Sequence, residues 1–177
     1  MLFSCNAVTP ENFAEAMKNT SPSKVTISTT TTTAGLGTLN GKYSITYNSD
    51  DTATIKYDCE LWASIPTDGS EISEDAKEKI TGTVTRDSDG SYSDSAFVED
   101  VEPALSLDVT KLTEYTISVD GKTLNATVSK DNTAAVFGVA YDFDVNLTVV
   151  KGANVIESVS LAYVEGSNEV SIKCIYD

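Results

Sequence analysis

Three oxygen-bearing side chains, Asp142, Asp144 and Asn146, stand at alternate positions of an alternating apolar and polar segment. In an extended strand, residues two apart share a face and lie about 7 Å from one another. Such a row could coordinate a cation, or two of its acids could act as a carboxylate pair. Charges on a solvated strand face also discourage edge pairing. We expect this last role, and hence neither a metal site nor a catalytic site.

A second oxygen-rich segment runs from Asp87 to Asp94 around Gly90. Oxygens at alternating positions around a glycine are how calcium-binding loops begin. The complete motif needs a third oxygen ligand before the glycine and a bidentate acid at its end, and neither is in register here. We therefore expect the tip of a β-hairpin, where Asp, Ser and Gly are favoured.

The amino-acid composition excludes several kinds of catalytic and metal-binding site. The 177 residues include no histidine, the side chain used most often for proton transfer near neutral pH and for transition-metal binding. His-based triads and ordinary catalytic zinc sites are therefore excluded. A carboxylate-only hydrolase ranks last, because no pair of acids lies in an apolar context that would raise the pKa of one of them. We expect no enzymatic activity and no cofactor.

The charge balance excludes several classes of partner. The sequence has 27 Asp and Glu against 12 Lys and Arg, a formal net charge of −15. A surface of that sign repels phosphate backbones and anionic lipid headgroups, so we expect neither nucleic-acid binding nor electrostatic docking to a membrane. No apolar run approaches the roughly 18 residues that a membrane-spanning helix needs.

The start of the chain carries a short motif. Leu2-Phe3-Ser4-Cys5 resembles the end of a bacterial lipoprotein signal peptide, where apolar and small residues precede a cysteine. The resemblance implies that Cys5 is lipidated and that residues 1–7 are a lipobox remnant or a flexible N-terminus. The alternative is a start methionine followed by a chance cysteine. With the anchor, the protein is expected in the bacterial cell envelope, at the outer membrane or in the periplasm, or it is secreted.

Two further cysteines, Cys59 and Cys174, fall at inward-facing positions of predicted strands. An envelope setting permits a disulfide between them, provided that their strands are neighbours. Free cysteine is also among the residue types that are most often buried. We expect two separate core thiols, with the disulfide as the alternative.

The elements that position these residues follow from a two-residue period. Apolar residues at every second position from Val139 to Val149 predict a strand with one face on a core. Polar turns at 151–154 and 165–168 then separate two more predicted strands, 155–164 and 170–176. Strands joined by short Gly/Asn turns are typical of an antiparallel meander.

The N-terminal half is predicted to hold one helix and several strands. Thr9 as a cap, Pro10 in the first turn and Glu11 near the positive end of the dipole predict a helix up to about residue 19. Gly35 to Gly41 is expected to break the chain. Strands are predicted at 24–33, 43–47, 53–63, 81–86, 91–98, 115–119 and 124–128, and short helical turns at 73–76, 107–112 and 131–136.

Together these elements predict an α+β fold that is mainly antiparallel β. An N-terminal helix is followed by a meandering curved sheet or half-barrel of about nine or ten strands. Residues 8–177 are expected to form a single β-rich domain, because a chain of this length can bury one real core.

The helix, the long meander after it and Cys5 resemble the LolA/LppX-type lipoprotein carriers and lipid-binding lipoproteins of the bacterial cell envelope. The strand from Gly41 to Ile45, followed by the strand from Ala53 to Ala63, fits the order of elements in that family. The resemblance implies a curved, incomplete barrel wrapped around a helix, with acyl chains held in its hollow.

Two functional hypotheses remain. The first is a non-enzymatic cell-envelope lipoprotein that binds a lipid or other hydrophobic ligand in its curved sheet, with membrane contact only through the N-terminal anchor. The alternative is a surface-exposed β domain for adhesion or protein–protein interaction, with a closed sandwich or barrel and an exposed aromatic patch around Trp62. In the first, the predicted ligand-lining residues, which could equally be filled core, are Tyr43, Ile45, Ile55, Leu61, Phe143, Leu147 and Ile172.

Overall fold

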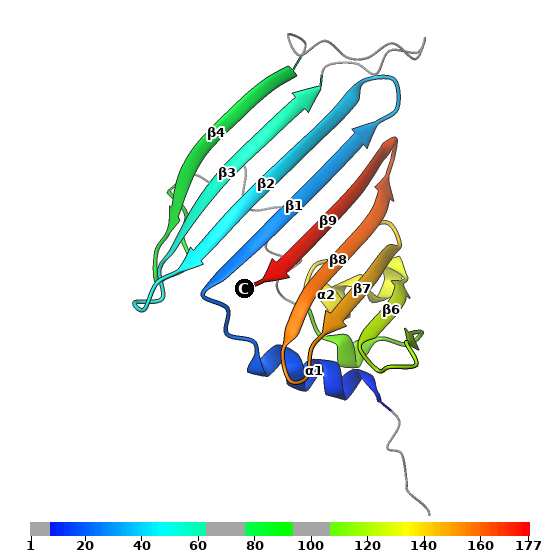
Figure 1. The fold of residues 1–177 in the computed structure, drawn as a ribbon. Helices are drawn as coiled ribbons and strands as arrows, with labels where there is room; N and C mark the ends of the chain where they lie inside the picture. Colours follow the sequence, from blue (N-terminus) through cyan, green and yellow to red (C-terminus); the bar gives the residue numbers. More distant parts are fainter. Residues whose placement is uncertain (1–7, 63–76, 94–106) are drawn as a thin grey trace, which may run out of the picture.

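A computed structural model describes residues 8–62, 77–93 and 107–177, with the side chains of Trp62 and Lys77 outside the description. Nine strands form one antiparallel sheet in the order β4-β3-β2-β1-β9-β8-β7-β6-β5 (Figure 1). Among the described strands, β4 and β5 are the free edges, so the curved sheet is not closed. The predicted α+β, mainly antiparallel class is confirmed. The closed sandwich or barrel that the alternative hypothesis required is wrong.

The strands are long in the N-terminal half and shorter around β5 and β6. The described elements in chain order are α1 (Pro10–Asn19), β1 (Lys24–Thr33), β2 (Gly37–Tyr47), β3 (Ala53–Trp62), β4 (Lys77–Arg86), the 3-10 helix η3 (Val109–Lys111), β5 (Thr116–Ile117), β6 (Thr123–Val128), the 3-10 helix η4 (Lys130–Asn132), α2 (Thr133–Phe137), β7 (Val145–Lys151), β8 (Ile156–Glu165) and β9 (Asn168–Tyr176).

Helix α1 has the predicted boundaries. Its first turn is closed by Asn12, whose side-chain oxygen accepts a hydrogen bond from the backbone N–H of Thr9 at 2.9 Å. Phe13 and Ala16 are buried against the sheet, and the Lys151 ammonium of β7 lies 5.5 Å from the centre of the Phe13 ring. The helix is short, so packing holds it in place more than propensity does. No helix in the described ranges is long and apolar enough to cross a membrane.

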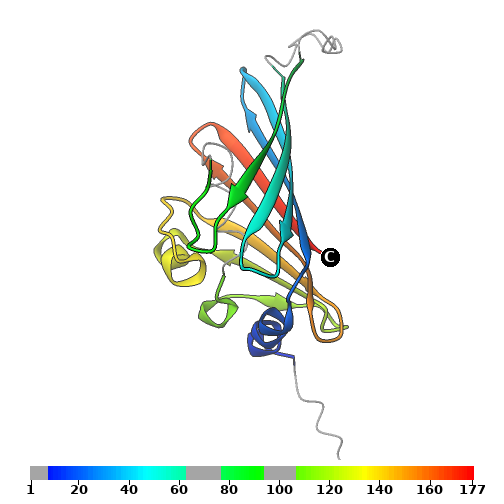
Figure 2. The ribbon, with the colours of Figure 1, turned by 90° about the vertical axis from the view of Figure 1, so that its left-hand side faces the viewer.

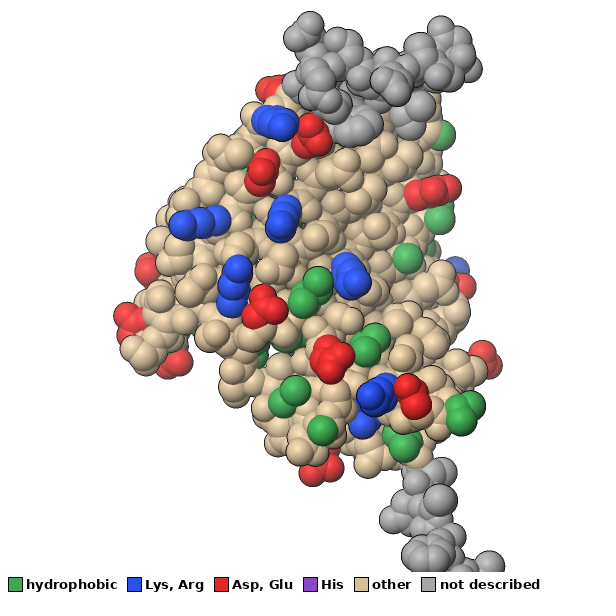
Figure 3. All heavy atoms as spheres, in the orientation of Figure 1, with side chains coloured by type: hydrophobic (Ala, Val, Ile, Leu, Met, Phe, Trp, Pro, Cys, Tyr) green, Lys and Arg blue, Asp and Glu red, His purple; other side chains and the backbone are tan. Residues whose placement is uncertain are grey.

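The two faces of the sheet differ in character. Figure 2 shows α1, α2 and η3 on one side of the C-terminal strands, which we call the inner face. The outer face, seen in Figure 3, shows scattered lysines and acids, with hydrophobic side chains mostly over its lower half. One buried row crosses six adjacent strands on the inner face and consists of Tyr43, Ile27, Cys174, Val159, Val149 and Leu124.

Strand β2 corrects the predicted break between residues 35 and 41. The turn is confined to the residues around Gly35, which has φ +74°, and the strand pairs with β1 from Gly37 onwards. A Cβ at Gly41 would lie 2.6 Å from Thr29 Oγ1 and 2.9 Å from the Tyr43 ring. Gly41 therefore makes room for neighbouring side chains within the strand and does not end it.

Strand β7 begins at Val145, so the prediction of a strand from Val139 is wrong for its first six residues. Gly138 ends α2 in the left-handed conformation, with φ +73°. The backbone N–H of Tyr141 then donates to Thr133 Oγ1 at 2.9 Å, and that of Lys130 donates to Asp144 Oδ1 at 2.9 Å. These bonds hold residues 139–144 against the preceding helical turns, and the segment forms no strand.

Other boundaries differ by a few residues. Strand β4 begins at Lys77, earlier than the predicted residue 81, and β5 contains only two residues. The predicted strand 91–98 is reduced, in its described part, to one bridge between Arg86 and Tyr92; residues 94–98 and the helical turn 73–76 lie outside the described ranges. The Asp120–Gly121 hairpin and the Asp108-capped turn are confirmed.

Candidate functional site

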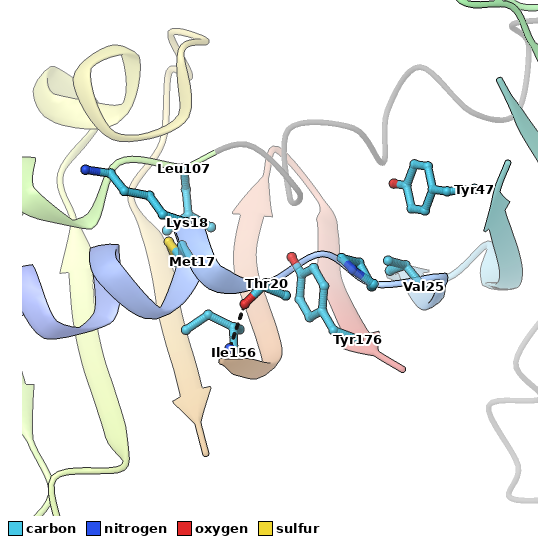
Figure 4. Close-up of a pocket in the computed structure, with 9 residues that line it drawn as sticks. Met17, Lys18, Thr20, Val25, Tyr47, Leu107, Ile156 and Tyr176 are labelled. Atoms are coloured by element: carbon cyan, nitrogen blue, oxygen red, sulfur yellow. Dashed lines mark hydrogen bonds between the residues drawn. The ribbon is translucent and has the colours of Figure 1, made fainter. Parts of the chain in front are cut away.

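A cavity of about 530 Å³ lies where the C-terminal end of α1 meets the ends of β1, β2 and β9 (Figure 4). Most of its wall is apolar or aromatic. The residues that line it are Met17, Lys18, Thr20, Pro22, Val25, Tyr47, Leu107, Ile156 and Tyr176. Volumes of about 300 to 1,000 Å³ with a few placed polar groups are typical of small-molecule sites.

The helix side of the cavity is fixed by Thr20, the residue after α1. Its hydroxyl donates a hydrogen bond to the carbonyl of Ala16 at 2.7 Å and accepts one from the backbone N–H of Ile156 at 2.8 Å. Its own N–H donates to the carbonyl of Met17 at 3.1 Å. The last turn of α1 is thereby joined to the start of β8, which keeps Met17 and Ile156 on adjacent walls.

The sheet side of the cavity is fixed by backbone hydrogen bonds at the start of β1. The carbonyl of Ser23 accepts from the N–H of Tyr47, and the carbonyl of Lys24 accepts from the N–H of Asp177, both at 3.0 Å. Tyr176 is paired with Val25 in the β1–β9 register. Tyr47 and Tyr176 lie on β2 and β9, the two strands that flank β1, and in Figure 4 the Tyr47 hydroxyl points toward the side where Met17 and Leu107 lie.

Among the described residues that line the cavity, Lys18 alone carries a full charge, and its side chain is exposed at the rim. The pKa of the nearby Asp108 carboxyl is lowered, first by the Thr110 side-chain hydrogen bond and also by the charges of Lys111 and Lys18. Burial, with a smaller effect of Cys174 and Tyr47, raises the pKa of the Tyr176 hydroxyl above the usual tyrosine value. This hydroxyl is therefore a neutral donor at physiological pH.

The structure brings none of the seven predicted lining residues to this cavity. Five of them, Tyr43, Ile45, Ile55, Leu147 and Ile172, are buried in the hydrophobic core. Leu61 lies at the opposite end of β3 and is 39% exposed. Phe143 packs in an aromatic cluster, 4.5 Å from Tyr163 and 5.1 Å from Tyr141 between ring centres.

Phe143 does border a different cavity, also of about 530 Å³. That cavity is lined by more polar side chains, including the acids Asp144 and Glu169 together with Asn146 and Ser171. Burying acids beside an apolar ligand is costly. The cavity at α1 is therefore the better candidate for a hydrophobic ligand.

Sequence reasoning missed Met17, Tyr47, Leu107 and Tyr176 as members of one site. Tyr47 and Tyr176 are inward-facing residues at the ends of their strands, and the alternation of apolar and polar residues in the sequence does predict this direction. Nothing in the linear sequence shows that the ends of β2 and β9 meet the end of α1. Leu107 comes from a segment whose position depends on the whole fold.

The two inner cysteines are free and buried. Strands β2 and β1 separate β3, which carries Cys59, from β9, which carries Cys174. Three strand spacings amount to about 14 Å, whereas a disulfide requires Cα atoms within about 7 Å. The disulfide considered from the sequence is therefore not formed; instead, the Cys59 thiol contacts the Tyr43 hydroxyl at 3.6 Å.

The oxygen-rich segments hold structural hydrogen bonds. Asp89 Oδ1 accepts from the N–H and the hydroxyl of Ser91 at 2.9 and 2.7 Å, which forms the predicted hairpin tip. Asp144 accepts from the backbone of Lys130, and Asn146 accepts from the hydroxyl of Thr127 at 2.9 Å. Within the described parts of the chain, no group of three or more Cys, Asp or Glu side chains is placed to hold a metal ion.

No protein-family model and no curated protein matches this sequence. Among solved structures, a redesigned β barrel, mFAP1, bound to DFHBI is 12% identical with a TM-score of 0.25, covering 91% of this chain and 98% of that chain. A LolA superfamily protein from Nitrosomonas europaea is 12% identical with a TM-score of 0.30, covering 95% of this chain and 92% of that chain. Both TM-scores are too low to assign a family or a ligand.

Proposed function

We propose that this protein binds a hydrophobic, lipid-like ligand in the cavity between α1 and the sheet and does not act as an enzyme. The observation that carries the proposal is the wall itself, an apolar and aromatic lining around about 530 Å³ of space. Apolar ligands bind in such sites because both surfaces leave water.

Two features of the wall support this role. The hydrogen bonds of Thr20 and Ser23 hold the helix and strand ends in place, which lowers the entropic cost of binding. Met17 is half-buried at the cavity surface, and the flexible thioether side chain of methionine adapts to the shape of a ligand. The site is therefore mostly preformed, with one adjustable wall.

We further propose that the protein is held in the bacterial cell envelope by lipidation of Cys5, or is secreted. The support is the Leu2-Phe3-Ser4-Cys5 motif, which resembles a lipobox. Growth with an alkyne-labelled fatty acid, followed by fluorescent labelling of the protein, tests the anchor. A lipidated wild type and an unlabelled Cys5→Ser variant are expected; equal labelling of both would contradict the assignment.

Native mass spectrometry of the protein purified without detergent tests ligand binding. We expect a population heavier than the chain by the mass of a small lipid, which is lost after extraction with organic solvent. A single apo mass, combined with no uptake of a fluorescent fatty-acid probe, would contradict the proposal.

A second candidate function is docking of another protein copy at the opposite end of the sheet. Leu39 and Leu61 are direct partners on neighbouring strands and are 41% and 39% exposed, and Leu36 in the adjacent turn is 71% exposed. Exposed apolar patches of this kind mark interaction sites. Sedimentation that shows a dimer in the wild type and a monomer in Leu39→Ser would favour this function; a monomeric wild type would exclude this form of it.

A further inference from the structure

The polar groups around the α1 cavity differ in charge and in whether they already make hydrogen bonds within the protein. The Thr20 hydroxyl is occupied, because it donates to Ala16 and accepts from Ile156. The Tyr176 hydroxyl is a neutral donor whose pKa is raised by burial. Lys18 differs from both because it is charged and its ammonium group extends from the last turn of α1 at the exposed rim.

The last turn of α1, which holds Lys18, is a favourable place for a positive charge. A cation in the last turn of a helix interacts favourably with the free carbonyl groups there. Asp108 follows the lining residue Leu107, and its pKa is lowered first by the Thr110 side-chain hydrogen bond and to a smaller extent by the charge of Lys18. Asp108 is itself bound by the N–H and hydroxyl of Thr110 at 3.1 and 2.6 Å, so its carboxylate remains anchored to η3.

The chain as a whole repels anions, since its formal net charge is −15. An anionic ligand therefore needs a local cation wherever it binds. Figure 4 shows the Lys18 ammonium at one end of the lining, beyond Leu107, with Val25, Tyr47 and Tyr176 toward the other end. This order, with a charge at one end and apolar or aromatic surface along the rest, matches an amphiphile with one anionic end.

We infer that the ligand of this cavity is a single-chain amphiphile with a carboxylate head, and that Lys18 binds the head at the rim. The inference rests on the proposed function and names its ligand class. A volume of about 530 Å³ suits one hydrocarbon chain, in the range of drug-sized sites. The carboxylate accepts a charge-assisted hydrogen bond from Lys18, while the chain packs between Val25, Tyr47 and Tyr176.

Binding of laurate and of the alcohol with the same chain length tests this inference. The full chain is titrated with each compound in the presence of a fluorescent fatty-acid probe. Lys18→Gln is expected to weaken laurate binding about three- to tenfold, in keeping with one partly exposed charge-assisted bond, and to weaken alcohol binding by a smaller factor, because a neutral hydroxyl accepts a weaker hydrogen bond from the ammonium than a carboxylate does. The matched control is Lys24→Gln, since Lys24 is exposed and close in sequence but does not line the cavity.

A second variant, Asp108→Asn, changes the charge near Lys18 without changing a side chain that lines the cavity. Asp108→Asn removes a carboxylate whose pKa is influenced by Lys18, so it is expected to tighten laurate binding and to leave alcohol binding unchanged. Equal laurate affinity in wild type and Lys18→Gln would overturn the inference, while uptake of the alcohol would leave the proposed function standing. Failure of both compounds to bind would instead remove the proposed function.

Discussion

The hydroxyl oxygen of Thr20 lies 2.8 Å from the backbone nitrogen of Ile156, and this hydrogen bond joins the end of α1 to the first residue of β8. Both residues line the same cavity. Because the hydroxyl also donates to the carbonyl of Ala16, one side chain satisfies a helix-end acceptor and a strand-end donor. The position of α1 over the cavity depends on this pair of bonds.

Replacing Thr20 by Val is expected to destabilise the protein by about 1–3 kcal/mol, because the Ile156 N–H loses its partner in a partly buried position. Ligand affinity should fall as well, since the helix wall is released. The control is Thr127→Val, where an exposed hydroxyl loses only a bond to the Asn146 side chain and the change should stay within about 0.5 kcal/mol. Equal denaturant midpoints for the two variants would contradict the assigned role of Thr20.

Gly41→Ala is expected to destabilise the protein by about 1–3 kcal/mol, because a Cβ there would stand 2.6 Å from Thr29 Oγ1 and 2.9 Å from the Tyr43 ring. Gly152→Ala is the matched control, since its close contact is the end of the exposed, flexible Glu157 side chain. Urea unfolding of both variants makes the comparison. A Gly41→Ala variant as stable as Gly152→Ala would show that β2 tolerates the methyl group.

The stability of the fold should fall in alkaline solution through Cys174. Burial raises the pKa of its thiol from 9.0 to about 12, so above pH 9 the unfolded chain releases a proton that the folded chain keeps. Stability is then full below pH 9 and declines toward pH 12, by up to about 1.4 kcal/mol per pH unit for one group. Denaturation at several pH values should show a shallower decline for Cys174→Ala than for the wild type; equal slopes would contradict the effect.

Counting free thiols tests whether Cys59 and Cys174 form a disulfide bond. Protein expressed without lipidation contains three cysteines, and the denatured, unreduced chain should release three equivalents of thiol to Ellman's reagent. One equivalent would indicate that the two inner cysteines had paired, which the β3-β2-β1-β9 order forbids.

Alternation of apolar and polar residues predicted most of the sheet, because a strand with one buried face leaves that mark wherever a neighbour pairs with it. It failed before Val145, where Val139, Tyr141 and Phe143 alternate without a neighbouring strand, and Tyr141 and Phe143 belong instead to an aromatic cluster. The prediction of a chain break at Gly41 also failed. Glycine propensity suggested a turn there, whereas the glycine is needed because the Tyr43 ring lies beside it within the strand.

The candidate site was not predictable in the same way. Its walls come from α1, the ends of β1, β2 and β9, the start of β8 and the residue Leu107, and their meeting depends on strand order. The sequence instead favoured Ile45, Ile55 and Leu147, whose inward direction was correct but which the core fills. Inward direction alone does not distinguish a packed side chain from one that borders a cavity.

The central claim is that the space beside Met17 holds a hydrophobic ligand, and filling that space tests it most directly. A fluorescent fatty-acid probe is titrated into the wild type, into Met17→Trp and into Val119→Trp, where Val119 is fully exposed at a hairpin tip. We predict saturable binding to the wild type and to Val119→Trp, with a loss of about tenfold or more in affinity for Met17→Trp at unchanged fold by circular dichroism. Equal probe affinity in all three proteins would contradict the account.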